Sequence, residues 1–105
     1  MEVTLEAKLD TGSDLCVFNR VYADLLNLEL ENGTVQSIRT AAGSFLTYAH
    51  EVKISVKDLE WEATVYFAVP ADFPVNVLGR KGFIDHLRLG VIDYDQILYL
   101  ADYNS

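Results

Sequence analysis

Residues 1–9, MEVTLEAKL, alternate strictly between apolar and polar side chains. A period of two is typical of a β-strand that turns one face to the core and the other to solvent. The alternation stops at residues 10–14, Asp-Thr-Gly-Ser-Asp, which are all turn-forming types. The sequence therefore predicts a half-buried strand that ends in a tight turn, and a β-rich fold has to be built around it.

Short apolar or alternating runs continue along the chain, separated by turn residues. They predict strands at residues 15–18, 35–41, 45–56, 59–69 and 75–79, and then a strand, a turn at residues 93–96 and a final strand within residues 88–100. Many short strands with frequent turns favour one all-β domain over residues 1–105, either a closed barrel-like sheet or a sandwich. The small residues AAGS at 41–44 suit the tip of a hairpin.

One or two short helices complete the predicted fold. Residues 19–28, NRVYADLLNL, predict the first helix, with Asn19 as its N-cap. The apolar face expected for this helix consists of Val21, Leu25, Leu26 and Leu28. Residues 80–90 predict one or two further helical turns.

Charge and composition exclude several classes of function. The formal net charge of −8 opposes binding to phosphate backbones and anionic membrane surfaces, so we expect neither nucleic acid nor membrane as a partner. The sequence has no charged-then-apolar leader and no apolar run near ~18 residues, and we expect a cytoplasmic location. Cys16 is the only cysteine and lies in an apolar run, which predicts a buried, inert thiol. We expect no metal and no cofactor, and structural roles for His50 and His86.

The turn at residues 10–14 also carries candidate chemistry. Asp10 directly follows an apolar strand, so its carboxylate is expected at a strand end beside the core. Because Gly12 has no side chain, another group can come close to its backbone, or the residue can take a positive φ. Ser13 can donate a hydrogen bond to a carboxylate. Asp-Thr-Gly alone is a moderate signal, because a plain β-turn at the end of a strand also accounts for it.

A second motif, VNVLGR at residues 75–80, places apolar residues and a glycine just before a predicted helix. With Asp10–Ser13 and the hairpin tip at 41–44, in this order along the chain, it resembles the retropepsin-like aspartic proteases. These are the single-domain, homodimeric branch of the pepsin superfamily, and the resemblance is closer to prokaryotic members than to viral ones. It extends from the first strand to about Leu100 and implies the all-β, barrel-like acid protease fold.

The resemblance implies a role for each residue of the turn. In this family each of two chains supplies one catalytic aspartate, so a homodimer is implied. The catalytic loop would consist of the aspartate, a threonine that reaches across the dimer and a glycine whose carbonyl faces substrate: Asp10, Thr11 and Gly12. Three residues would support this loop: Ser13, Asp14 and Arg80. Of these, Asp14 and Arg80 are implied to form a carboxylate–guanidinium pair.

The resemblance also implies a flap that closes over a bound peptide. Its residues would be Ala41, Ala42, Gly43, Ser44 and Phe45. Phe45 and Leu46 would line its underside. The expected substrate is a peptide or an unfolded protein, bound in an extended form.

The implied activity is that of an aspartic endopeptidase. Two carboxylates at hydrogen-bonding distance cannot both ionise cheaply, so the pair shares one proton at acidic pH. The ionised partner acts as general base on a bound water and the protonated partner polarises the scissile carbonyl. This chemistry needs neither a metal nor a covalent intermediate.

Two departures and two alternatives accompany this interpretation. Only nine residues precede Asp10, so the domain is expected to lack the leading strand usual in the family. Lys81 stands where retroviral enzymes have Asp or Asn.

The alternative function is a catalytically silent module of the same fold that binds peptides or dimerises. In a third interpretation, a small β-barrel, residues 10–12 are only a turn.

Overall fold

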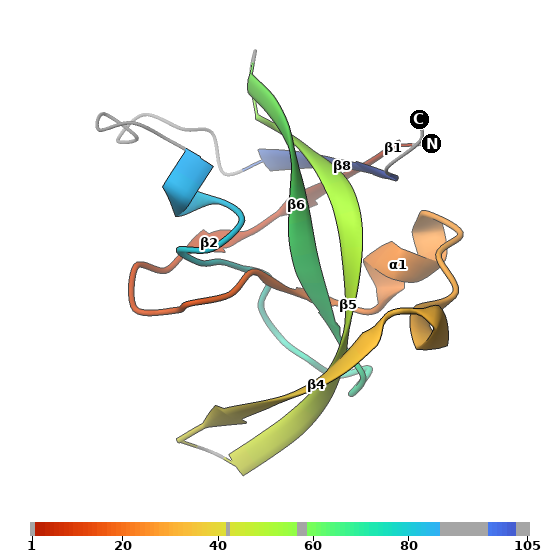
Figure 1. Cartoon of the computed structure of the whole chain (residues 1–105), viewed down its shortest axis with the longest axis vertical. Helices are drawn as coiled ribbons and strands as arrows, with labels where there is room; N and C mark the ends of the chain where they lie inside the picture. The colour runs from red at the N-terminus through yellow and green to blue at the C-terminus, as the bar shows by residue number, and fades with distance from the viewer. Residues whose placement is uncertain (1, 42, 57–58, 87–96, 103–105) are drawn as a thin grey trace.

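The structure, a computed structural model, describes residues 2–41, 43–56 and 59–86 and the backbone of residues 97–102. The strands are β1 (Glu2–Glu6), β2 (Lys8–Leu9), β3 (Val17–Asn19), β4 (Thr34–Thr40), β5 (Gly43–Val56), β6 (Leu59–Ala68), β7 (Val77–Leu78) and β8 (Ile97–Asp102). The short helices are α1 (Val21–Leu25) and the 3₁₀ turns η1 (Leu30–Asn32) and η2 (Ile84–His86). The all-β prediction is confirmed (Figure 1). The predicted turn at residues 93–96 and the strand before it lie outside the described residues.

The strands pair in the order β1-β8-β5-β6-β3-β7-β2, and β4 pairs with β5. β1 and β2 stand at the two ends of this order and do not pair with each other, so the described strands do not form the closed sheet that was expected. Both belong to one stretch of chain, residues 2–9, interrupted only at Ala7. This continuous stretch, which pairs with β8 through β1 and with β7 through β2, connects the two ends of the order without a hydrogen-bonded pair between them.

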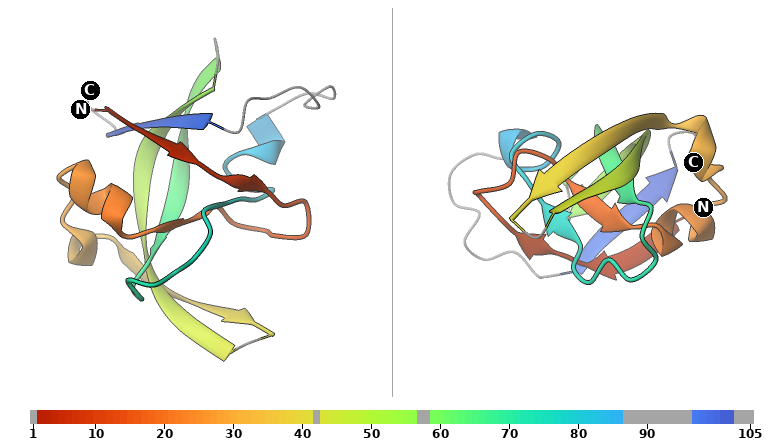
Figure 2. Two further views of the ribbon diagram at one scale, coloured as in Figure 1. Left: turned by 180° about the vertical axis from the view of Figure 1, so that it is seen from behind. Right: turned by 90° about the horizontal axis from the view of Figure 1, so that it is seen from below.

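The long strands β5 and β6 form the central hairpin, paired from Thr47↔Ala68 to Val56↔Leu59. β4 pairs with the first part of β5, from Thr34↔Ala49 to Thr40↔Gly43, as predicted for a hairpin with its tip near residues 41–44. The β4–β5 hairpin projects from the body of the molecule, on the same side as the loop that follows β2 (Figures 1 and 2). The loop that follows β2 and the β4–β5 hairpin, which are distant in sequence, thus lie on one side of the molecule (Figures 1 and 2).

The core is formed by the inward-facing residues of β3, β5 and β6. Phe18 and Phe67 are fully buried with ring centroids 6.3 Å apart, and they pack among Val52, Ile54 and Val65. Burying a side chain of this kind contributes about 1.5–3 kcal/mol, so this cluster contributes strongly to the stability of the domain.

Helix α1 is confirmed but its predicted apolar face is partly wrong. Leu26 and Ala23 are buried, whereas Val21 and Leu25 are 44% and 50% exposed. The helix has only five residues, so it ends before a stripe of 3.6 periodicity can be laid against the core. No helix in the described ranges is long and apolar enough to cross a membrane.

Candidate active site

Asp10 lies where strand β2 ends. β2 pairs in parallel with β7 (Lys8↔Val77, Leu9↔Leu78), and the Asp10 amide extends this ladder by donating to the Leu78 carbonyl at 3.0 Å. The chain then turns, and the Ser13 amide donates to the Asp10 carbonyl at 3.1 Å. The predicted strand-end position of the carboxylate is confirmed, and we call residues 10–14 the Asp10 loop.

A backbone hydrogen bond fixes the orientation of the Asp10 carboxylate. The Gly12 amide donates to Asp10 Oδ1 at 2.9 Å, while Oδ2 has no hydrogen-bond donor among the described residues. The Ser13 hydroxyl does not supply one, because it donates to the Leu15 carbonyl at 2.9 Å. A hydroxyl has one proton to give, so the expected Ser13-to-carboxylate bond is absent within this chain.

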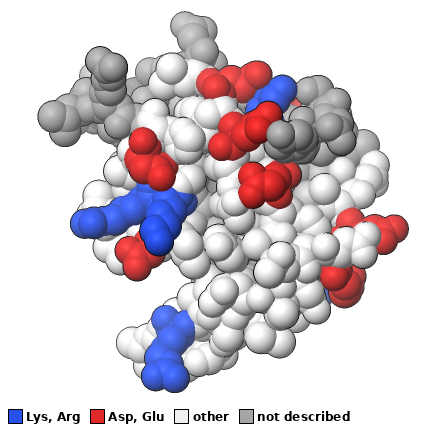
Figure 3. Space-filling model, in the orientation of Figure 1, with Lys and Arg blue, Asp and Glu red and all other residues white. Residues whose placement is uncertain are grey.

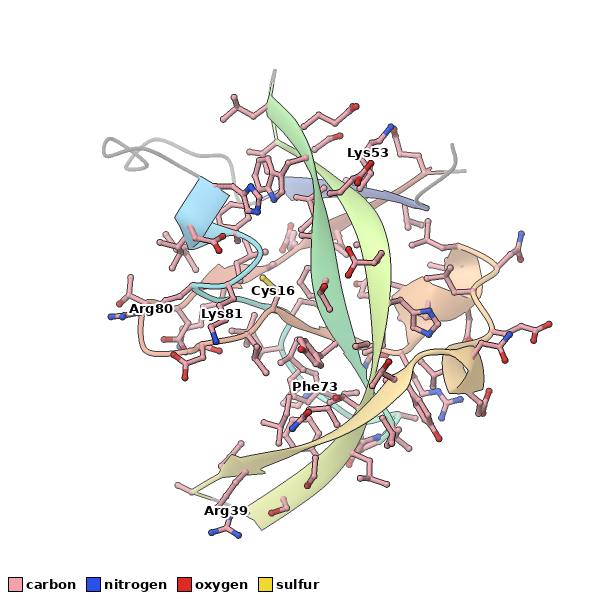
Figure 4. The ribbon with its side chains drawn as sticks, viewed as in Figure 1. Cys16, Arg39, Lys53, Phe73, Arg80 and Lys81 are labelled. Carbon is pink, nitrogen blue, oxygen red and sulfur yellow. The ribbon has the colours of Figure 1, made fainter. Side chains whose placement is uncertain are left out.

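Arg80 braces the Asp10 loop through backbone acceptors. Its Nε donates to the Thr11 carbonyl and its amide to the Ser13 carbonyl, both at 2.9 Å, and the Lys81 amide donates to the Asp14 carbonyl at 2.9 Å. The expected ion pair between Arg80 and the Asp14 carboxylate is not formed, because the guanidinium is turned to the Thr11 carbonyl. Arg80 and Lys81 both lie beside this loop in Figure 4.

The exposed part of the Asp10 loop is available to another molecule. Thr11 and Gly12 are both exposed, and the Thr11 hydroxyl has no hydrogen-bond partner in the described part of the chain. The roles that the resemblance gives to these two residues involve a second chain and a substrate, and they stay predictions.

The tip of the β4–β5 hairpin carries the predicted flap residues. Ala41, Gly43 and Ser44 are exposed, and Gly43 has φ 130°, a conformation that L-residues rarely adopt. Ala42 lies outside the described residues.

Phe45 and Leu46 do not share one face of the hairpin, which corrects the prediction that both line the underside. Successive residues of a strand point to opposite faces. The Phe45 ring meets the Phe73 ring, with centroids 5.4 Å apart, whereas Leu46 is 49% exposed on the other face.

Cationic side chains lie on both the Asp10 loop side and the hairpin side of this region (Figure 4). In Figure 3 cationic and acidic side chains lie together beside the Asp10 loop, where Figure 4 labels Arg80 and Lys81. Figure 4 labels Arg39 near the hairpin tip, and the surface is indented between the two areas (Figure 3). A separate pocket of about 320 Å³ adjoins the loop, with Leu15, Lys81 and Glu51 among its lining residues. Asp10 does not line this pocket.

Cys16 is fully buried behind the Asp10 loop, as predicted. Its Sγ donates to the Lys81 carbonyl at 3.5 Å, and burial raises the pKa of the Cys16 thiol from 9.0 to about 11. Because the thiolate is the reactive form, this cysteine is a poor nucleophile at neutral pH.

The raised pKa of Cys16 predicts a loss of stability at alkaline pH. A thiol that holds its proton more tightly in the folded state stabilises that state below the unfolded pKa of about 9, and this contribution disappears as pH rises through about 11. The free energy of unfolding of the parent, minus that of Cys16→Ala, should therefore fall by about 2–3 kcal/mol between pH 8 and pH 11. Chemical unfolding of both proteins across this range measures it, and a constant difference would contradict the prediction.

The two histidines make structural contacts. His50 Nε2 lies 2.9 Å from the Leu30 carbonyl, and its ring packs edge-on against Phe67. His86 stacks on Trp61 with centroids 5.3 Å apart. The described residues contain no group of three or more His, Cys, Asp or Glu side chains suited to a metal ion.

Comparison with known proteins gives one clear match. A family model described as aspartyl protease matches residues 2–93, which includes the Asp10 loop, the β4–β5 hairpin and β7. A search of curated proteins found no match. A search of solved structures found none either.

Proposed function

The chain belongs to the aspartyl protease family, whose members hydrolyse peptide bonds, and we propose that it is an endopeptidase that works as a homodimer with one Asp10 from each copy. The Asp10 loop supports this proposal more than any other feature. It presents a carboxylate at a strand end, fixed at Oδ1 by the Gly12 amide and braced from behind by Arg80.

In this mechanism the two Asp10 carboxylates share one proton. The ionised carboxylate takes a proton from a bound water, which attacks the scissile carbonyl, and the protonated carboxyl donates a hydrogen bond to that carbonyl oxygen. A proton then passes to the leaving nitrogen. The Gly12 amide holds Oδ1 of each carboxylate, so Oδ2 is the oxygen left to meet its partner and the water.

In the proposed homodimer, a second copy of the chain supplies the second catalytic aspartate. The chain carries a single Asp-Thr-Gly sequence, and closed two-fold symmetry places two copies of it at one axis. The exposed Thr11 hydroxyl, without a partner in the described part of its own chain, is the group we assign to the contact across this axis.

The substrate would be an extended peptide or an unfolded protein. We place it in the indentation between the Asp10 loop and the β4–β5 hairpin, the latter acting as the flap (Figure 3). An extended peptide can bind there by adding a strand to exposed backbone groups, which gives affinity through main-chain hydrogen bonds.

A combined measurement of mass and turnover tests the proposal. Sedimentation should show a dimer, and an unfolded test protein should be cleaved at about pH 4 to 6, with inhibition by pepstatin. The specific activity should rise with protein concentration through the range in which the dimer forms. A dimer that binds the test protein without cleaving it would instead indicate a catalytically silent module, and a strictly monomeric chain that cleaves would contradict the shared dyad.

A further inference from the structure

Asn19 uses its whole carboxamide at the end of strand β3. Its Nδ2 donates to the carbonyls of Ala71 and Phe73 at 3.2 and 2.9 Å, and its Oδ1 accepts from the Val21 amide at 2.9 Å. The three partners fix which way the amide points, because a backbone N–H can only donate and carbonyls can only accept. The Val21 bond is the one expected of an N-cap, although Arg20 is the residue directly before helix α1.

The end of β3 also holds the loop formed by residues 69–76 at both of its ends. Arg20 Nη1 donates to the Val69 carbonyl at 3.2 Å, and the Asn19 amide donates to Asn76 Oδ1 at 2.9 Å. With the two bonds from Asn19 Nδ2, four hydrogen bonds connect two neighbouring residues to this loop. Its conformation therefore depends on β3, from a distance of about fifty residues in sequence.

The 69–76 loop contacts the β4–β5 hairpin at one end. At its other end it leads into the paired strands β7 and β2, which we call the floor of the site. On the hairpin side, Phe73 packs against Phe45, and the Val69 amide donates to the Leu46 carbonyl at 2.9 Å. On the floor side, the loop runs into β7, which pairs with β2 just before Asp10. Figures 1 and 2 show the loop passing from the foot of the β4–β5 hairpin toward the Asp10 loop, and Figure 4 places Phe73 between them.

We propose that Asn19 is a positioning residue for substrate binding, holding the 69–76 loop, and through Phe73 the hairpin, at a fixed distance from the Asp10 loop. The inference rests on the proposed function, because it assumes that the peptide lies between hairpin and floor. Phe45 and Phe73 are only half-buried, so their rings give this gap an apolar wall. A large apolar substrate side chain is the partner that such a wall favours.

A fixed wall affects binding of the peptide more than the chemical step. Asn19 does not belong to the Asp10 loop and acts through the 69–76 loop. If the loop moves, the substrate loses contacts that it makes equally in the ground state and in the transition state, and such a loss raises KM with little change in kcat.

Asn19→Asp is the most selective test variant. It keeps an oxygen for the Val21 amide but replaces both Nδ2 donors by an oxygen that faces two carbonyls. We expect hydrogen exchange of residues 43–47 and 69–75 to be about tenfold faster, with exchange in the β5–β6 pairing unchanged. On a peptide made from a site that the parent selects in an unfolded test protein, KM should rise about tenfold and kcat should stay within about twofold.

Two further variants complete the test. Asn32→Asp makes the same chemical change in η1, where the side chain bonds Glu29, and it should leave both exchange and KM as in the parent. Asn19→Ser keeps a good cap residue and removes the donors without adding charge, so it should reproduce the effects of Asn19→Asp even if that variant folds poorly.

The outcomes separate the inference from the proposed function. An active parent whose Asn19 variants exchange and cleave as it does would overturn the inference and leave the protease function standing. Lower kcat at unchanged KM would also overturn it, because that pattern indicates a direct role in the chemical step. A parent without turnover would contradict the proposed function, and hydrogen exchange would then still support or refute the link from Asn19 to the hairpin.

Discussion

An Asp10→Asn variant is expected to lose peptide-bond hydrolysis, with kcat lower by a factor of about 10³ or more. An amide can neither take a proton from water nor donate an acidic proton to the scissile carbonyl. The fold should be unaffected, because the asparagine Oδ1 can accept from the Gly12 amide as Asp10 Oδ1 does at 2.9 Å. Initial rates on an unfolded protein, with chemical unfolding of both proteins, separate the loss of chemistry from any loss of stability.

Asp24→Asn is the matched control for this variant. It makes the same change of charge on the exposed surface of helix α1, and kcat should stay within about twofold of the parent. If Asp10→Asn cleaved as fast as the parent, the aspartic mechanism would be wrong for this chain. The alternative interpretation, that residues 10–12 are only a turn, would then be favoured.

The fold followed from the sequence wherever local pattern decides structure. The alternation predicted strands that the structure confirms as β1 and β2 within residues 2–9 and as β6 at Leu59–Ala68, and the predicted hairpin is confirmed by the β4–β5 pairing as far as Thr40↔Gly43. The pairing of β1 with β8, some ninety residues apart, leaves no local signal and was not predicted. The exposed Val21 and Leu25 show the same limit, since a five-residue helix is positioned by tertiary contacts and not by its own periodicity.

The strand-end position of Asp10 was predicted, but the contacts of the loop around it were not. Asp10 at a strand end follows from an apolar run before a turn, and the structure confirms it. The acceptor chosen by Arg80 depends on where the Thr11 carbonyl points after the turn, which residue types do not specify. Asn19 carried only a helix-cap signal, because its bonds to the 69–76 loop need the folded arrangement of segments far apart in sequence.

Gly79→Ala is expected to be among the most damaging single substitutions, lowering the free energy of unfolding by about 3–5 kcal/mol. An added Cβ would overlap the Leu15 carbonyl oxygen and lie 2.7 and 2.8 Å from the carbonyl carbon and amide nitrogen of the same residue. All three are backbone atoms, so no side-chain rotation relieves the clash. The segments could only move apart, and this would break the bonds from the Arg80 amide to Ser13 and from the Lys81 amide to Asp14.

Gly43→Ala separates this clash from the loss of conformational freedom. Gly43 has φ 130° and no atom within 4 Å of an added Cβ, so alanine there adds backbone strain alone and should cost only about 1–2 kcal/mol. Denaturant unfolding of the parent and both variants gives the comparison, and Gly79→Ala within about 1 kcal/mol of the parent would contradict the close packing. Since Gly79 lies against the segment that carries the Asp10 loop, any Gly79→Ala protein that still folds should also lose turnover. Glycine is therefore required at position 79 because its backbone lies against the backbone of Leu15. The same backbone contact holds the Asp10 loop, and with it the Asp10 carboxylate, in place.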